Sequence, residues 1–196
     1  MKITKDIDEL VVEYLSLSDK MRNGYEDSLG IASQTWNETF NKIISTVPEV
    51  FRAIYGKVAG TYRNTENQKF MDFVPGYRLI HIKEIESEYH TLLQMLVPDD
   101  ICEAQIRIII PILADASACY ICYAKINNNE ETIFHYSPDD GLQKMHNSVE
   151  LFLKTIIAFY LKNVFYLDRD GFLDYDFERE GIIGAEYNPG IDYWTE

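Results

Sequence analysis

Apolar residues at helical spacing along the chain predict five amphipathic helices. The first extends from about Lys5 to Leu17 with Thr4 as its cap, and the last opens at Ser148, where Asn147 and Glu150 have the spacing of a capping box. A proline opens the third helix and glycines follow it. The expected helices cover, in order, residues 5–17, 33–44, 47–55, 83–96 and 148–164, and the second begins at either Ser33 or Thr35.

Between the last two helices, short apolar runs replace the helical spacing. Residues 105–113 and 118–126 are nearly continuous stretches of β-branched and aromatic side chains, typical of central strands covered on both faces. Residues 132–136 predict their antiparallel neighbour after a turn at 127–130, and a short strand begins at Gly76. The sequence therefore predicts an α+β domain with a mostly antiparallel central sheet and helices packed on it.

The composition indicates one domain with a full core. The 196 residues are 46% hydrophobic, and this length argues against two independent domains. No run approaches the ~18 apolar residues of a membrane span, and the N-terminal residues lack an apolar signal core, so we expect a cytoplasmic protein that binds no membrane. Three cysteines fit a reducing compartment, and Cys119 and Cys122 would point to opposite faces of a strand, so they predict no shared metal.

Four short segments follow one another in a characteristic order between residues 36 and 161. They are a Pro-opened helix that ends in an aromatic residue and Gly, a strand that enters a helix at an acid, an Ile-Pro-Ile strand before an Asp turn, and a closing Ser-x-x-x-Phe-Leu helix. The positions that carry the pattern are Pro48, Tyr55, Gly60, Leu79, Glu84, Ile110, Pro111, Ile112, Asp115, Ser148, Phe152 and Leu153. In this order the segments resemble the SUKH superfamily, which includes fungal cell-wall-synthesis regulators and many bacterial toxin-immunity proteins.

The resemblance implies a SUKH-like domain over residues 31–166. Residues 1–30 would be a helical extension, and residues 167–196 an acidic, aromatic extension packed on the same domain. The chain departs from the family pattern after Asp115, where Ser117 and Ala118 stand in place of a Gly. The resemblance also implies a binding protein, because bacterial members commonly neutralise toxins, often nucleases, inside the producing cell.

Charge adds information about the partner. The chain has 32 acidic and 18 basic residues, a net charge of −14. The surplus is uneven: residues 167–196 hold nine acids and two basic residues, a sum of −7, and residues 1–30 hold seven and four, a sum of −3. Such a field repels phosphate, so the sequence disfavours direct binding of DNA or RNA and favours a basic protein partner.

Candidate catalytic residues are few. Four histidines are scattered along the chain, and the sequence has no zinc-protease, nucleophile-elbow or phosphate-loop motif. A calcium loop around Gly171 would need carboxylates where Tyr166 and Phe177 stand. We therefore predict a protein that is not an enzyme, with no catalytic, cofactor or metal residues. The enzyme alternative is a hydrolase that uses His135 with Asp115 or Asp139.

The predicted partner-binding residues are acids of loops and of the C-terminal segment, where aromatic residues are also frequent. Interfaces favour aromatic anchors within a charged rim. The residues are Asp115, Asp139, Asp140, Asp168, Asp170, Asp174, Tyr175 and Asp176. We expect an immunity protein that neutralises a cognate, basic toxin such as a nuclease. The alternative is an intracellular scaffold or regulatory protein of the same fold, and the sequence leaves the oligomeric state open.

Overall fold

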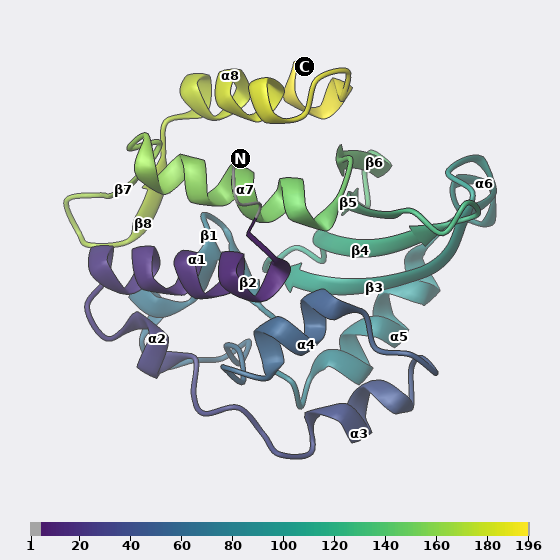
Figure 1. Cartoon of the computed structure of the whole chain (residues 1–196), viewed down its shortest axis with the longest axis horizontal. Coiled ribbons are helices and arrows are strands. Elements are labelled where there is room, and N and C mark those ends of the chain that lie inside the picture. Colours follow the sequence, from purple (N-terminus) through teal and green to yellow (C-terminus); the bar gives the residue numbers. More distant parts are fainter. Residues whose placement is uncertain (1–4, 196) are drawn as a thin grey trace.

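The computed structural model describes residues 5–195, and its centre is one six-stranded antiparallel sheet (Figure 1). The strands lie in the sheet in chain order, and each pairs only with its neighbours along the chain. They are β1 (Asp72–Val74), β2 (Tyr77–Leu79), β3 (Ile106–Ala114), β4 (Tyr120–Ile126), β5 (Glu131–Ser137) and β6 (Gly141–His146). Helices cover the sheet in a single compact α+β domain, so the predicted fold class is confirmed.

The two apolar runs form the longest pair of strands, β3 and β4, with Ile106 opposite Ile126 and Ala114 opposite Tyr120. The turn before β5 is also as expected, and Asn129 takes a φ of 65° there. Strand β6 was not predicted. Its segment has no β-branched residue, and it becomes a strand as the hairpin partner of β5.

One face of the sheet contacts α5 (Ile85–Met95), which α6 (Pro98–Glu103) follows. The Tyr120 hydroxyl donates to Glu88 Oε2 at 2.8 Å, and the Tyr136 hydroxyl donates to the Met95 carbonyl at 3.2 Å. The β2 residue Arg78 has a side chain only 3% exposed and pairs with Glu84 at 2.8 Å and with Glu88 at 2.6 Å. A buried ionic network therefore joins α5 to β2 and β4. Pro98 ends α5 as predicted and also opens α6.

Four helices precede the sheet in the described chain: α1 (Ile7–Met21), α2 (Tyr25–Ser28), α3 (Trp36–Asn41) and α4 (Glu49–Tyr55). Thr4, the expected cap of α1, lies outside the described residues. Asp6 caps this helix, since its side chain accepts the Glu9 N–H at 2.8 Å and the Glu9 carboxylate accepts the Asp6 N–H. Helix α3 ends at Asn41, earlier than predicted, so the segment at 43–44 lies beyond it.

Helix α7 (Val149–Leu161) is enclosed between α1, the sheet and α8 (Phe177–Tyr187) (Figure 1). Ser148 caps it by accepting the Leu151 N–H at 3.1 Å, so the expected capping role of Asn147 is wrong. A second hairpin, β7 (Phe165–Leu167) with β8 (Leu173–Tyr175), leads from α7 to α8. Two 3-10 helices complete the fold, η1 (Gln68–Phe70) and η2 (Asp192–Trp194).

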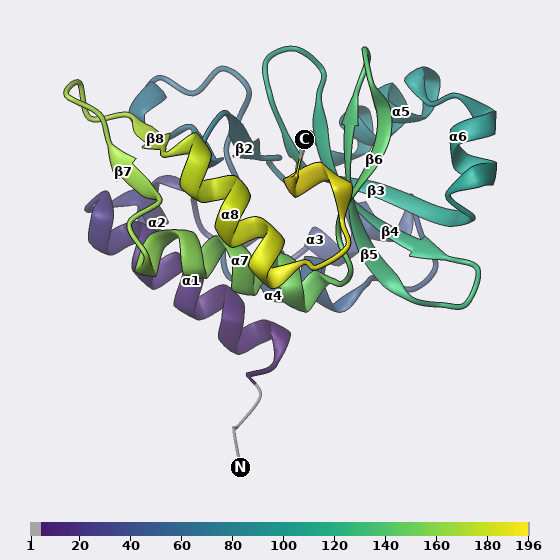
Figure 2. The same ribbon diagram turned by 90° about the horizontal axis from the view of Figure 1, so that it is seen from above.

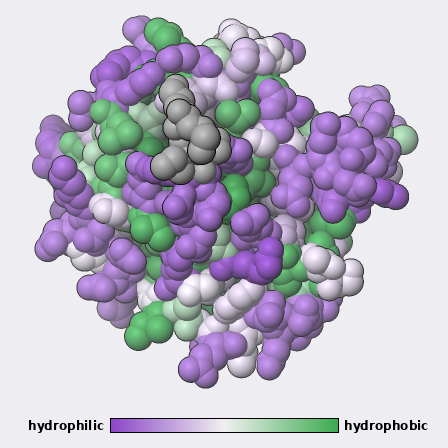
Figure 3. All heavy atoms as spheres, viewed as in Figure 1, coloured by the Kyte–Doolittle hydropathy of each residue, from purple (hydrophilic) through white to green (hydrophobic). Residues whose placement is uncertain are grey.

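The C-terminal segment folds back over α7 and returns to the sheet (Figure 2). Trp194 is 6% exposed, and its Nε1–H donates to the Met145 carbonyl of β6 at 2.7 Å. Seen as in Figure 1, the surface is mostly hydrophilic, with hydrophobic residues in separated patches (Figure 3). No helix within residues 5–195 is both long and apolar enough to cross a membrane.

Candidate partner-binding surface

Three of the predicted site residues lie in the turns at one end of the sheet. Asp115 follows β3, and its Oδ1 accepts the N–H groups of Ser117 and Cys119, both at 2.7 Å. Between them, Ala118 takes a φ of 64°, so an alanine adopts the left-handed conformation that glycine favours. The Asp115 carboxylate therefore organises this turn in addition to carrying charge.

Asp139 and Asp140 occupy the turn between β5 and β6. The Ser137 hydroxyl lies 3.3 Å from Asp140 Oδ2, and its oxygen accepts the Asp139 N–H at 3.2 Å. Burial raises the pKa of the Cys119 thiol to about 11, and the charge of Asp115, its hydrogen bond and the charges of Asp139 and Asp140 add to this rise. The two turns are therefore close enough for their carboxylates to act on one side chain.

The predicted acids of the C-terminal segment begin at the tip of the β7–β8 hairpin. Asp168 Oδ1 accepts the N–H groups of Asp170 and Phe172, both at 2.9 Å, and the bond from Phe172 lowers the Asp168 pKa. Lys69 holds this tip to η1, because its Nζ donates to the Asp170 carbonyl and lies 5.8 Å from the centroid of the Phe172 ring. A cation of the same chain thus already contacts this part of the acidic segment.

The remaining predicted residues lie in β8 and at the cap of α8. The Tyr166 hydroxyl donates to Asp174 Oδ2 at 3.3 Å, and the Asp176 side chain caps α8 by accepting the Arg179 N–H at 3.1 Å. Tyr175 is half-buried between them. Asp174 and Asp176 thus both accept hydrogen bonds from their own segment, and no ion pair reaches either carboxylate from residues 5–195.

The sheet end and the C-terminal segment meet at Tyr77 of β2. Its hydroxyl and His135 Nε2 form a hydrogen bond of 2.8 Å. Burial raises the Tyr77 pKa strongly, and the nearby groups that raise it further include Tyr193, Asp115 and Tyr175. The structure therefore brings the turn acids next to β8 and η2, while Asp168 and Asp170 lie apart, at the hairpin tip beside Lys69.

Exposed hydrophobic side chains accompany these acids on α8. Phe177 is 74% exposed and Ile182 is 69% exposed. Both line a groove of about 420 Å³ between α8 and η2, together with Tyr175, Glu180 and Tyr193. Within the described residues 165–195, eight acids oppose two basic residues, a sum of −6. The geometry is that of apolar anchors within an acidic rim.

Glu180 is the residue of this groove that the sequence did not single out. It lies in the first turns of α8, and burial raises its pKa to about 7. No ion pair reaches its carboxylate from residues 5–195. Sequence position alone could not separate it from the other acids of the segment, because its burial depends on the return of η2 onto α8.

Three of the four histidines are held by packing, and His90 is exposed. His146 is fully buried, with Nδ1 3.1 Å from Asn188 Oδ1, and burial lowers its pKa to about 3. His81 stacks on Tyr62 with ring centroids 3.6 Å apart, and burial lowers its pKa to about 4. His135, the residue of the enzyme alternative, bonds to Tyr77, and its pKa is lowered by burial. No cluster of three or more potential metal ligands occurs within the described chain.

Comparison with protein-family models and with curated proteins finds no match for this chain. The resemblance to the SUKH superfamily therefore stays a prediction.

Proposed function

We propose that this chain is a binding protein that neutralises a basic protein, and that its role is immunity against a cognate toxin. The observation that carries the proposal is the combination on one surface of acids without an ion pair among residues 5–195, the exposed side chains of Phe177 and Ile182, and the half-buried carboxylate of Glu180. The SUKH-like order of segments in the sequence supports the same role. We call this surface, formed by Asp115, Asp139, Asp140, Asp174, Tyr175, Phe177, Glu180 and Ile182, the acidic surface.

The charge of the acidic surface suits fast capture. A net charge of −14 on the chain and a local sum of −6 in residues 165–195 attract a basic protein over a distance set by the ionic strength. Electrostatic steering of this kind raises association rates by about 10 to 1,000-fold at low salt. A nuclease must itself be basic where it holds phosphate, so it is a natural partner of such a surface.

The groove suits slow release. Phe177 and Ile182 expose apolar surface that a partner would cover, and aromatic side chains are frequent hot spots of interfaces. A lysine or arginine that enters the groove would meet the Glu180 carboxylate beside the rings of Tyr175 and Tyr193. A bound cation stabilises the ionised form of Glu180. We therefore expect the affinity for the partner to increase as the pH rises through about 7.

The test is co-expression with the product of the gene immediately upstream. We expect that product to be a basic protein that stops growth on its own, and growth to return when this chain is present. Phe177→Ala should weaken protection, while Val12→Ala, at an exposed position of α1, should not. An upstream product that is harmless, or one that remains toxic while this chain is folded and abundant, would contradict the proposal.

A further inference from the structure

Strand β3 is an inner strand of the sheet, but most of its edge on the β2 side has no strand partner among the described residues. The strand comprises residues 106–114, but β2 pairs only with Leu113 and Ala114, and the Ile80 N–H donates to the Ile112 carbonyl at 3.1 Å. No strand pairs with residues 106–111 on this side in the part of the chain that the structure describes. Half of the main-chain groups of a strand point toward each neighbour, so those that point away from β4 lack a strand partner.

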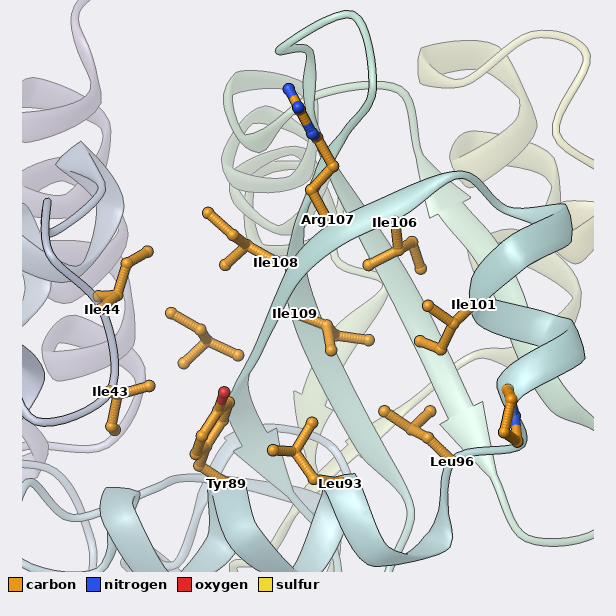
Figure 4. Close-up of a pocket in the computed structure, with 12 residues that line it drawn as sticks. Ile43, Ile44, Tyr89, Leu93, Leu96, Ile101, Ile106, Arg107, Ile108 and Ile109 are labelled. Carbon is orange, nitrogen blue, oxygen red and sulfur yellow. The ribbon is translucent and has the colours of Figure 1, made fainter.

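This edge lies at the bottom of an apolar groove of about 500 Å³ (Figure 4). Side chains leave the strand on both sides of the edge: Ile108 points toward Ile43 and Ile44, whereas Ile109 points toward Leu96 and Ile101. The segment after α3 forms one wall, and α5 with α6 forms the other. A segment that entered the groove would therefore find apolar surface on both sides.

We propose that this groove binds an extended segment of another protein, which adds to the free edge of β3 as a further strand. Unpaired N–H and C=O groups in a row are a template for a strand, and apolar walls on both sides select alternate side chains of that strand. Arg107, exposed at the rim without an ion pair among the described residues, selects an acidic residue in the same segment. The occupant is therefore a short, mostly apolar segment with an acid near one end.

A second copy of this chain does not fit the same edge. Paired strands lie about 4.8 Å apart, and in a second copy the free edge of β3 would again lie between two walls of side chains. Two recessed edges cannot approach that closely. Register irregularities between Ile106 and Ile108 and between Pro111 and Leu113 also limit the regular stretch to residues 108–111, so the matching segment is about four residues long.

The proposal goes beyond the function proposed above, because no residue that lines this groove belongs to the acidic surface. The experiment selects displayed random peptides of about ten residues on the full chain, on Ile44→Glu and on Val12→Glu. Ile44 lies in a wall of the groove, and Val12 is an exposed apolar residue of α1 that serves as the matched control. We expect β-branched peptides with an acid to be enriched on the wild type and on Val12→Glu, and binding to Ile44→Glu to be at least about tenfold weaker.

Two N-methylated forms of an enriched peptide separate strand addition from simple apolar binding. Methyl groups on the amides that face β3 should weaken binding at least about tenfold, whereas methyl groups on the alternate amides should not. Leu93→Glu, on the opposite wall, provides a second variant, and circular dichroism shows whether each variant is folded. The proposal would be overturned if the wild type enriched peptides no more than folded Ile44→Glu or Leu93→Glu does. It would also be overturned if the two methylated forms bound the wild type equally well. Either result would leave the acidic surface untouched.

Discussion

Replacement of Gly184 by alanine tests whether the C-terminal segment is an integral part of the domain. Gly184 lies within α8, and the Trp194 indole packs directly on its Cα. An alanine Cβ at this position would overlap Cε3 and Cδ2 of the indole and would lie 2.7 Å from Cζ3. Because Trp194 is buried and hydrogen-bonded to Met145, the whole segment must shift to accept one methyl group.

The size of the effect follows from two opposing contributions. Overpacking of a well-filled site costs about 1–3 kcal/mol, and expulsion of the indole would approach the roughly 3–5 kcal/mol of a Trp→Ala change. Replacement of a glycine inside a helix returns about 0.5–1 kcal/mol. We therefore expect Gly184→Ala to lower the free energy of unfolding by about 1–2 kcal/mol, or by roughly 3–4 kcal/mol if Trp194 leaves its site.

Gly181 provides the matched control in the same helix. A Cβ there would lie 3.5 Å from the Trp194 carbonyl oxygen, which is an ordinary contact. Gly181→Ala should therefore keep the helix gain and be up to about 1 kcal/mol more stable than the wild type. Urea unfolding of both variants, followed by tryptophan fluorescence, gives the difference. Equal stability of the two variants would refute the packing of Trp194 on Gly184.

Three further predictions concern buried charge and pH. Arg78→Met should lower the free energy of unfolding in urea by about 3–5 kcal/mol, because Glu88 is left buried without its cationic partner. Adding Glu88→Leu should recover much of this loss. A cost below about 1 kcal/mol for Arg78→Met alone would contradict the buried network. The folded pKa of His146, about 3, lies below the unfolded value of roughly 6.5, so the stability it contributes is present above that unfolded value and is lost as the pH falls toward about 3. His146→Gln should flatten this loss in urea titrations between these limits, and an unchanged slope would argue against a neutral, buried imidazole. The affinity of the wild type for the proposed toxin should increase as the pH rises through about 7, and Glu180→Gln should remove this increase in calorimetric titrations. Glu186→Gln, at the exposed end of α8, is the control and should keep the increase. A wild-type affinity that is constant across this range would contradict a contact with Glu180.

The sequence predicted the elements whose pattern is local. The apolar runs of β3 and β4, the Pro48 helix entry and the stripe of α7 depend on periodicities that residues near in sequence determine. The sequence did not predict β6, because its polar residues become a strand only by pairing with β5. The sequence also predicted the wrong cap for α7. Asn147 and Ser148 are both good capping residues, and only the backbone geometry of the folded chain shows that Ser148 is the cap.

The candidate site was predicted by charge but not by geometry. The acids of the turns and of the C-terminal segment could be named from composition and turn chemistry. Asp168 and Asp176 accept N–H groups from residues two to four positions away, so these bonds are local, whereas Asp174 accepts from the Tyr166 hydroxyl only where β7 pairs with β8. The partial burial of Glu180 and the free edge of β3 are tertiary features, because they depend on where η2 returns and on where β2 ends.

The central claim is that the acidic surface attracts a basic protein through the position of its charges and not only through the net charge of the chain. The direct measurement is the association rate with the purified upstream product at low and high salt, for the wild type and two variants of equal net charge. One carries Asn at Asp115, Asp139, Asp140 and Asp174, which all belong to the acidic surface, and an Asn at position 115 keeps the acceptor oxygen of its turn. The other replaces Glu26, Asp27, Glu38 and Glu49 by the corresponding amides, on α2, α3 and α4 at the far side of Figure 1 from α8.

We predict that the wild-type association rate falls at least about tenfold as the Debye length shortens from roughly 30 Å to 8 Å, and that the first variant loses most of this dependence while the second keeps it. A wild-type rate that is indifferent to salt, or equal losses in the two variants, would contradict capture by the acidic surface.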